Sequence, residues 1–218
     1  TVAASLAAGN GCVIKPAELT TLSTLDFMKV FADLPENLVA CLPGGSDVGK
    51  ALVDSSKTHA VAFTGSVAAG KAVAAAAAAK MKPAVIEAGG SDPMIITANA
   101  PIAVAAAGAV TGAFHMSGQV CTSTERMYVV DSVHDEFVEA FKAETLRLRI
   151  GNGLDKSEIG PLVSKAARDK VERLVADAVA KGATVVCGGK IPEAHQTGWF
   201  YEPTILTDCT TDMDILHE

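Results

Sequence analysis

The stretch that decides the fold is AVAFTGSVAAGKAVAAAAAAKMKPAVIEAGG, which spans residues 60–90. Two apolar runs in it, residues 60–63 and 84–87, are typical of buried strands. Between them, Thr64-Gly65-Ser66 opens an alanine-dominated helix, and Pro83 marks its end because proline cannot continue a helix. A strand, a crossover helix and a second strand predict a parallel pair covered by its helix.

The same alternation continues on both sides of this stretch. Upstream, short apolar runs predict strands at residues 12–14 and 38–42. Downstream the pattern is looser, and strands are expected at residues 127–130 and 184–187. The predicted fold class is therefore α/β, with parallel strands and covering helices. Helices are expected at residues 47–55 and 101–114. A third helix should begin at a cap formed by Ser132 with Asp135. A fourth, amphipathic helix should begin at a cap formed by Ser164 and end at Lys181-Gly182.

The composition describes an acidic chain with enough apolar residues for a substantial core. Its 218 residues are 49% hydrophobic and 20% charged, with a formal net charge of −7. The apolar fraction excludes intrinsic disorder, and the absence of a Lys/Arg cluster argues against nucleic acid as a partner. The most apolar segment, residues 68–79, is shorter than the about 20 residues that a membrane span needs, so no membrane partner is expected.

Cysteine usage points to free thiols. The chain has five cysteines, an odd count, with no CxxC pair, and its histidines lie away from them, so neither a disulfide framework nor a metal site is expected. Free thiols favour a reducing compartment such as the cytoplasm. Cys121 is the best candidate for a nucleophile, because polar residues surround it and Gly118 leaves room for a substrate. Cys12 and Cys187 lie in strand patterns and are expected to be small buried residues.

Two places have residues that suit a nucleotide. Gly65 and Ser66 begin a helix whose first N–H groups are unpaired and attract an anion, although this segment taken alone favours an ordinary strand–helix turn. Lys15 and Glu18 follow the first strand, and ligands of open α/β sheets gather at the carboxyl ends of strands. A solvated lysine and a glutamate at a helix start are the alternative.

Glu87 is a candidate general base. It ends an apolar strand just before Gly89-Gly90, and burial among apolar groups raises the pKa of a carboxyl group toward neutrality. A strand-end glutamate that faces water is the alternative interpretation.

Taken in order, these motifs resemble the aldehyde dehydrogenase superfamily over essentially the whole chain. The resemblance rests on Ala7-Ala8-Gly9-Asn10 with Val13-Ile14-Lys15-Pro16-Ala17-Glu18, Phe63-Thr64-Gly65-Ser66 with Gly70, Glu87-Ala88-Gly89-Gly90, Gly118-Gln119-Val120-Cys121, Ile159-Gly160-Pro161-Leu162 and Tyr201-Glu202-Pro203-Thr204.

The resemblance implies the NAD(P)-dependent oxidation of a small aldehyde to a carboxylic acid. Cys121 would attack the carbonyl to form a thiohemiacetal, and its own N–H would help to hold the oxyanion. Loss of hydride to the nicotinamide would leave a thioester, and Glu87 would activate the water that hydrolyses it.

The resemblance also assigns the cofactor-binding residues. Lys15 and Glu18 would bind the adenosine ribose, Gly65 and Ser66 the pyrophosphate, and Gly89 would keep space near the nicotinamide. An acidic Glu18 beside the ribose would repel a 2′-phosphate, so NAD is the expected cofactor and NADP the second candidate.

The resemblance implies that residues 1–88 are part of an NAD(P)-binding domain with a Rossmann-like parallel sheet. Residues 89–218 would be part of an α/β catalytic domain. The family's oxyanion asparagine would precede Thr1 and its second ribose-binding glutamate would follow Glu218. We therefore expect an interior fragment that is inactive alone, from a full-length protein that forms a homo-oligomer.

Met116 departs from the family pattern, because asparagine is usual two residues before the glycine of the nucleophile motif. Met116 and the missing ends favour a rival hypothesis, a non-catalytic nucleotide-binding or scaffold protein with the same fold. A second rival is a thiol esterase that uses Cys121 and Glu87 without a cofactor. Retention of both residues opposes the scaffold, and a requirement for NAD would separate a dehydrogenase from the esterase.

Overall fold

The computed structural model of the protein describes residues 1–217 and divides into two compact units, Thr1–Ala88 and the chain from Gly89 onward. Among the described residues, no helix is both long enough and apolar enough to cross a lipid bilayer.

The first unit is built from parallel strand pairs and helices, which confirms the predicted α/β class. Strand β1 (Cys12–Ile14) pairs with β2 (Val39–Cys41), and β3 (Val61–Gly65) pairs with β4 (Ala84–Ala88), both in parallel. Parallel pairing follows from the helices between the strands, because each crossover returns the chain to the same edge. The helices are α1 (Val2–Ala7), α2 (Thr21–Phe27), α3 (Ser46–Asp54) and α4 (Val67–Ala78), with 3-10 turns at Glu18–Thr20 and Met28–Phe31.

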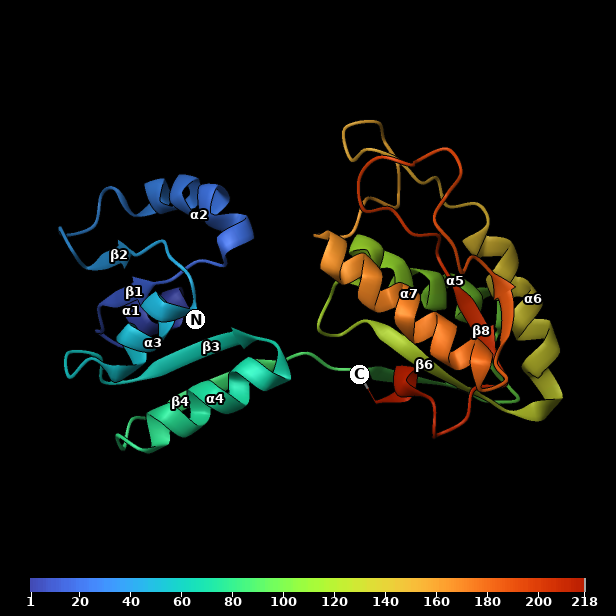
Figure 1. The fold of residues 1–218 in the computed structure, drawn as a ribbon, viewed down its shortest axis with the longest axis horizontal. Helices are drawn as coiled ribbons and strands as arrows, with labels where there is room; N and C mark the ends of the chain where they lie inside the picture. The colour runs from blue at the N-terminus through green and yellow to red at the C-terminus, as the bar shows by residue number, and fades with distance from the viewer. Residues whose placement is uncertain (218) are drawn as a thin grey trace. The chain divides into compact units, whose positions relative to one another are not determined.

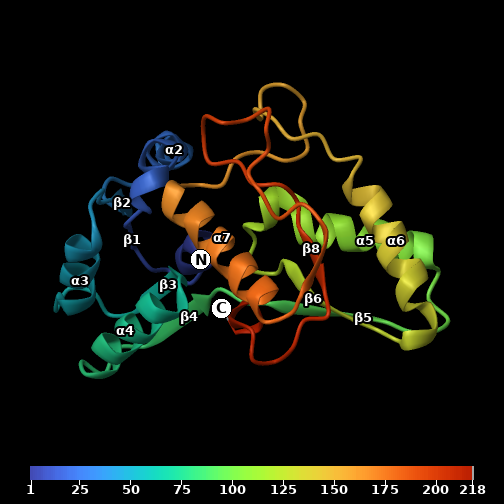
Figure 2. The same cartoon turned by 45° about the vertical axis from the view of Figure 1, so that its right-hand side comes forward.

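Helix α4 lies along the β3–β4 pair in both views (Figures 1 and 2). The approach is close, because a Cβ atom built on Gly70 would lie 2.9 Å from Cγ2 of Ile86. Ile86 pairs with Phe63, and side chains alternate along a strand, so Thr64 and its partner Glu87 point to the opposite face. The helix therefore covers one face of the pair and leaves the face with Glu87 open.

The second unit has its main core between two helices and two strand pairs. Strand β5 (Asp92–Ile96) pairs in parallel with β6 (Thr124–Val129), whereas β7 (Thr184–Cys187) and β8 (Ile205–Thr207) are antiparallel. Helix α5 (Ile102–Phe114) packs beside α6 (His134–Thr145), and α7 (Lys165–Ala180) follows them in the chain (Figure 1). Short 3-10 turns lie at His115–Gly118, Asp131–Val133 and Asp214–Leu216. The main core cluster comprises Ile96, Ala106, Ala109, Phe137, Phe141 and Ile205.

One predicted helix cap is confirmed and another is wrong. Ser164 caps α7, since its side chain accepts a hydrogen bond from the N–H of Ala167 at 3.1 Å. Ser132 does not cap α6, because a 3-10 turn occupies Asp131–Val133 and the helix begins only at His134, without a side-chain cap.

Two strands and two cysteines also differ from expectation. Strand β5 was not predicted, because it begins with Asp92-Pro93 rather than with an apolar run, and β8 was not predicted either. Cys12 and Cys187 do lie in strands, but they are only partly buried. Each of these strands has a single hydrogen-bonded neighbour, so the pair does not enclose the thiols completely.

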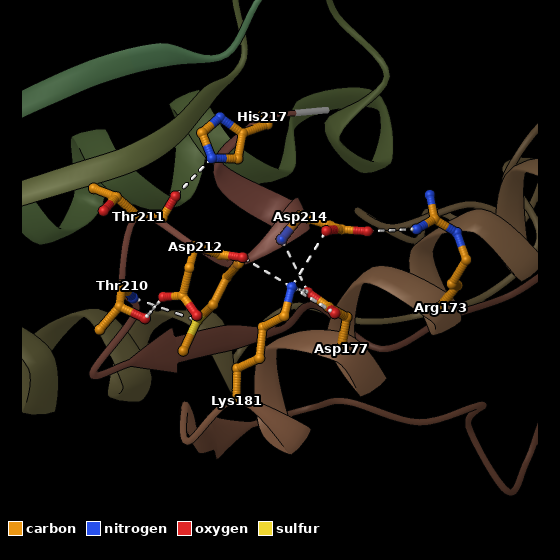
Figure 3. Close-up of polar contacts among 9 residues, drawn as sticks. Arg173, Asp177, Lys181, Thr210, Thr211, Asp212, Asp214 and His217 are labelled. Atoms are coloured by element: carbon orange, nitrogen blue, oxygen red, sulfur yellow. Dashed lines mark hydrogen bonds and ion pairs between the residues drawn. The ribbon is translucent and has the colours of Figure 1, made fainter.

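Lys181, the residue that follows α7, is at the centre of a polar network that holds residues 210–217 against that helix (Figure 3). Its ammonium lies 2.8 Å from Asp177 and 3.3 Å from Asp214, and it donates to the carbonyl of Asp212 at 2.8 Å. The N–H of Asp214 donates to Asp177 at 2.9 Å. Between these polar anchors, Met213 is fully buried.

We expect Asp177 to make the stability of the protein depend on pH in acid. Hydrogen bonds from Lys181 and from the N–H of Asp214 lower the pKa of Asp177 below its ordinary value of 3.8. A carboxyl group with a lowered pKa stabilises the fold above its unfolded-state pKa and loses that contribution as pH falls through the folded-state pKa. Asp177→Asn should therefore lower the free energy of unfolding at neutral pH, and the deficit should shrink below about pH 4.

Urea unfolding of the parent and the variant at about pH 7 and about pH 3 measures this effect. Asp169→Asn is the matched control, because Asp169 forms the same i,i+4 pair with Lys165 at 2.6 Å on the more exposed part of α7. Asp169→Asn should change the free energy of unfolding little at either pH. A deficit for Asp177→Asn that is equal at both pH values would refute the assignment.

Candidate active site

Cys121 occupies the second position of a tight turn and is exposed. The turn is closed by a hydrogen bond from the N–H of Ser123 to the carbonyl of Val120 at 3.0 Å. A turn of this kind uses only the carbonyl of its first residue and the N–H of its fourth. The N–H of Cys121 is therefore available to an oxygen that approaches the thiol.

Ser123 fixes the end of this turn to α5. The residue is 2% exposed, and its hydroxyl lies 3.1 Å from the carbonyl of Gly112 and 3.2 Å from that of Ala113. Both carbonyls belong to the last turn of the helix, where four carbonyls have no helical partner. The polar end of α5 thus anchors residues 116–123, which we call the candidate nucleophile loop.

Ser117 and Gln119 hold the other side of the loop against residues 160–163. The hydroxyl of Ser117 donates to the carbonyl of Gly160 at 2.9 Å, and the side-chain carbonyl of Gln119 accepts from the N–H of Val163 at 2.9 Å. The amide of Gln119 also donates to the carbonyl of Met116 at 3.1 Å, which closes the loop on itself. The positioning roles of Ser117 and Gln119 were not predicted from the sequence, although these bonds connect the segments of two motifs that were recognised there.

The backbone just before Cys121 is strained. Met116, Ser117 and Gly118 have φ values of 50°, 59° and 73°, all in the left-handed region. Glycine adopts this conformation freely, but a side chain brings Cβ too close to the following carbonyl, at about 1–2 kcal/mol per residue. Strain of this kind persists where surrounding contacts impose it, here the bonds of Ser117 and Gln119.

We expect Met116→Asn to stabilise the protein. Asparagine tolerates the left-handed region because its short polar side chain bonds locally, so the substitution should add roughly 0.5–1 kcal/mol to the free energy of unfolding. Met116→Ala is the control, because alanine has the same Cβ and gains no local bond. Urea unfolding measures both variants, and an asparagine variant no more stable than the alanine variant would refute the explanation.

Lys15 and Glu18 lie with a glycine turn at the carboxyl ends of β1 and β2. The ammonium of Lys15 donates to the carbonyls of Pro16 and Gly44, the latter at 2.9 Å. A Cβ atom built on Gly45 would lie 3.6 Å from Oε1 of Glu18. An ammonium has three N–H donors, so one donor of Lys15 remains for a ligand near the exposed carboxylate of Glu18.

Gly65 and Ser66 form the turn from β3 into α4. Ser66 caps the helix, since its hydroxyl accepts from the N–H of Ala69 at 3.2 Å. A Cβ atom on Gly65 would lie 2.6 Å from the ring of Phe63, so the ring would have to shift to admit a side chain there. The exposed first turn retains N–H groups without helical partners, which is the arrangement that binds anions.

Glu87 does not have the apolar setting that the sequence suggested. The residue is exposed, because α4 covers the other face of the β3–β4 pair. Glu87 belongs to the first unit and Cys121 to the second.

Gly89 and Gly90 begin the second unit, and Gly90 lies beside the candidate nucleophile loop. Nothing lies within 4 Å of a Cβ atom built on Gly89, whereas one on Gly90 would lie 3.0 Å from the carbonyl oxygen of Cys121. The structure therefore brings Gly90 against the residue that carries the thiol. Within residues 1–217, no three His, Cys, Asp or Glu side chains are grouped as metal ligands.

Comparison with known proteins gives consistent matches over the chain. A family model described as "Aldehyde dehydrogenase family" matches residues 1–218. Betaine aldehyde dehydrogenase of Brucella anthropi is 41% identical over 99% of this chain, which covers 45% of that protein. The chain thus spans about 45% of the length of the curated relatives that it matches.

Two solved structures are similar over almost all of the described chain. Succinate-semialdehyde dehydrogenase from Burkholderia pseudomallei has a TM-score of 0.93 and 34% identity, over 99% of this chain and 45% of its own. Betaine aldehyde dehydrogenase from Staphylococcus aureus in complex with NAD+ has a TM-score of 0.95 and 33% identity, over 100% of this chain and 44% of its own.

Proposed function

Because the chain belongs to the aldehyde dehydrogenase family, we propose that the protein oxidises a small aldehyde to the carboxylic acid with NAD(P). The observation that supports this most directly is the exposed thiol of Cys121, in a turn that is held on both sides and leaves the N–H of Cys121 available. A nucleophile must be accessible and fixed in position, and this loop meets both requirements.

In the proposed reaction, the sulfur of Cys121 bonds to the aldehyde carbon, and the carbonyl oxygen becomes an oxyanion. The N–H of Cys121 donates to that oxygen, which stabilises the charge as it develops. NAD(P)+, held by Lys15, Glu18, Gly65 and Ser66, would supply the hydride acceptor, and loss of hydride from the same carbon would leave a thioester on Cys121. Glu87 takes a proton from the water that attacks the thioester, and the cysteine thiolate leaves as the acid forms.

The residues at the two carboxyl edges of the first unit fit a dinucleotide. We assign Lys15 and Glu18 to the ribose hydroxyls, since one donates and the other accepts. Gly65 and Ser66 are assigned to the pyrophosphate, because the exposed first turn of α4 has N–H groups without helical partners, which attract an anion. Gly89 leaves open space for the nicotinamide. The carboxylate of Glu18 favours NAD over NADP by repelling a 2′-phosphate.

The assembly and location follow as further proposals. Large apolar side chains of the first unit are exposed, among them Leu22 at 82% and Val30 at 69%, and association of identical subunits would cover such surfaces. All five cysteines are free, which suits a reducing compartment such as the cytoplasm.

The test uses the protein as its native gene encodes it. Formation of NADH or NADPH is followed by absorbance with betaine aldehyde, succinate semialdehyde and simple aliphatic aldehydes. We expect aldehyde-dependent reduction, faster with NAD than with NADP. Ester hydrolysis without any nucleotide reduction would instead identify a thiol esterase. Nucleotide binding without either reaction would identify a non-catalytic protein of the same fold.

A further inference from the structure

We infer that Arg126 is a positioning residue, which holds the Gly90–Ser91 backbone against the candidate nucleophile loop. The inference deepens the proposed function and rests on it for its kinetic consequence. It concerns contacts made entirely within the second unit, between the start of β5 and the start of β6.

The pairing of β5 with β6 is irregular at its first residues. Asp92 pairs with Thr124, but Pro93 pairs with Arg126, so Glu125 has no partner in the register. Proline has no N–H and cannot donate to the ladder, and one extra residue on the facing strand is the defining feature of a β-bulge. The ladder is therefore interrupted close to Cys121.

Arg126 supplies donors at this interruption. Its Nε and Nη2 both donate to the carbonyl oxygen of Ser91, at 3.0 Å and 2.6 Å. Hydrogen bonds from a charged donor are shorter and stronger than those between neutral groups, and the planar guanidinium fixes the direction of both. The carbonyl is thus held by a side chain 35 positions away in the sequence.

The held segment runs directly along the candidate nucleophile loop. The N–H of Asp92 donates to the carbonyl of Ser123 at 3.2 Å. One residue before Ser91, a Cβ atom on Gly90 would lie 3.0 Å from the carbonyl oxygen of Cys121. The two hydrogen bonds from Arg126 to Ser91, which we call the Arg126 clamp, lie between these two contacts. Their loss therefore frees the Gly90 backbone to move relative to Cys121. A misplacement of about 1 Å beside reacting atoms can cost about 10²-fold in rate.

The kinetic test compares Arg126→Met and Arg126→Lys in the protein encoded by the native gene. We expect Arg126→Met to lower kcat for NADH formation about 10- to 100-fold per titrated active site, with smaller changes in KM for aldehyde and NAD. Lysine retains a cationic donor, so Arg126→Lys should recover part of kcat. Arg147→Met is the control, because Arg147 forms an exposed ion pair with Glu144 at the end of α6.

A purely structural role would lower the amount of folded enzyme or its melting temperature and leave kcat per titrated site unchanged. That result would overturn the inference, as would a lysine variant no better than the methionine variant. The proposed function is tested separately by Cys121→Ser, so an active parent with an inactive Cys121→Ser variant and a normal Arg126→Met variant refutes only the role of Arg126.

Hydrogen exchange tests the positioning without any turnover. The amide of Asp92 is protected by its bond to Ser123, so loss of the clamp should speed its exchange about tenfold or more in Arg126→Met. Amides of α7 serve as the internal reference and should be unchanged. Unchanged exchange at Asp92 would overturn the inference even if the protein had no dehydrogenase activity.

Discussion

Replacing Cys121 with serine is expected to abolish NADH formation from aldehydes, with a loss of about 10⁴-fold or more in kcat. A serine hydroxyl is a far weaker nucleophile than a thiolate, and nothing in the loop is placed to activate it. The exposed turn itself should survive, because its closing bond uses the backbone of Val120 and Ser123. Absorbance of NADH under saturating aldehyde and NAD measures the effect.

Cys209 provides the matched control, since it is the other exposed free thiol. Cys209→Ser should retain normal turnover, because partial desolvation of the sulfur by neighbouring atoms and the nearby Asp208 carboxylate raise the pKa of that thiol and disfavour its thiolate. Turnover by Cys121→Ser at the parent rate would remove the proposed nucleophile and, with it, the mechanism.

Replacing Glu87 with glutamine should slow the hydrolysis of the thioester about 10²- to 10⁴-fold, which is the usual contribution of a general base. The amide cannot take a proton from water, but the first hydride transfer does not need that proton transfer. We therefore expect a rapid burst of NADH, close to one equivalent per active site, followed by slow steady-state turnover. Stopped-flow absorbance separates the two phases.

Glu36→Gln is the control for this variant, because Glu36 is another exposed carboxylate of the first unit. It should show the kinetics of the parent. A Glu87→Gln variant that loses the burst and the steady state equally would place Glu87 before the thioester. An unchanged steady-state rate, with hydrolysis shown to limit the parent, would remove Glu87 from the reaction.

The exposure of Glu87 adds a condition to this prediction. The open face of the β3–β4 pair leaves the Glu87 carboxylate in water, whereas exclusion of water from a site strengthens the electrostatic interactions that act during a reaction. Efficient base catalysis therefore requires that this face be covered in the working enzyme. A bell-shaped or rising pH profile of the hydrolysis step would report the pKa of the base in that state.

Much of the fold could be read from the residues because it depends on local interactions. The strands and helix of residues 60–90 follow from apolar runs, a glycine turn and a proline stop. The predicted cap at Ser164 involves an N–H group only three residues away and is confirmed, whereas the cap predicted at Ser132 from the same kind of local pattern is wrong. The order of the motifs likewise indicated the family that the comparisons show.

Other features depend on residues that meet only after folding. The bond from Ser117 to Gly160 spans 43 positions, that from Gln119 to Val163 spans 44, and the clamp of Arg126 on Ser91 spans 35. No local pattern encodes such pairs. The strain at Met116 and the exposure of Glu87 have the same origin, because one depends on how the loop is held and the other on which face of the strand pair α4 covers. Local chemistry thus identified the candidate reactive groups, and packing between distant segments decided how each of them is held.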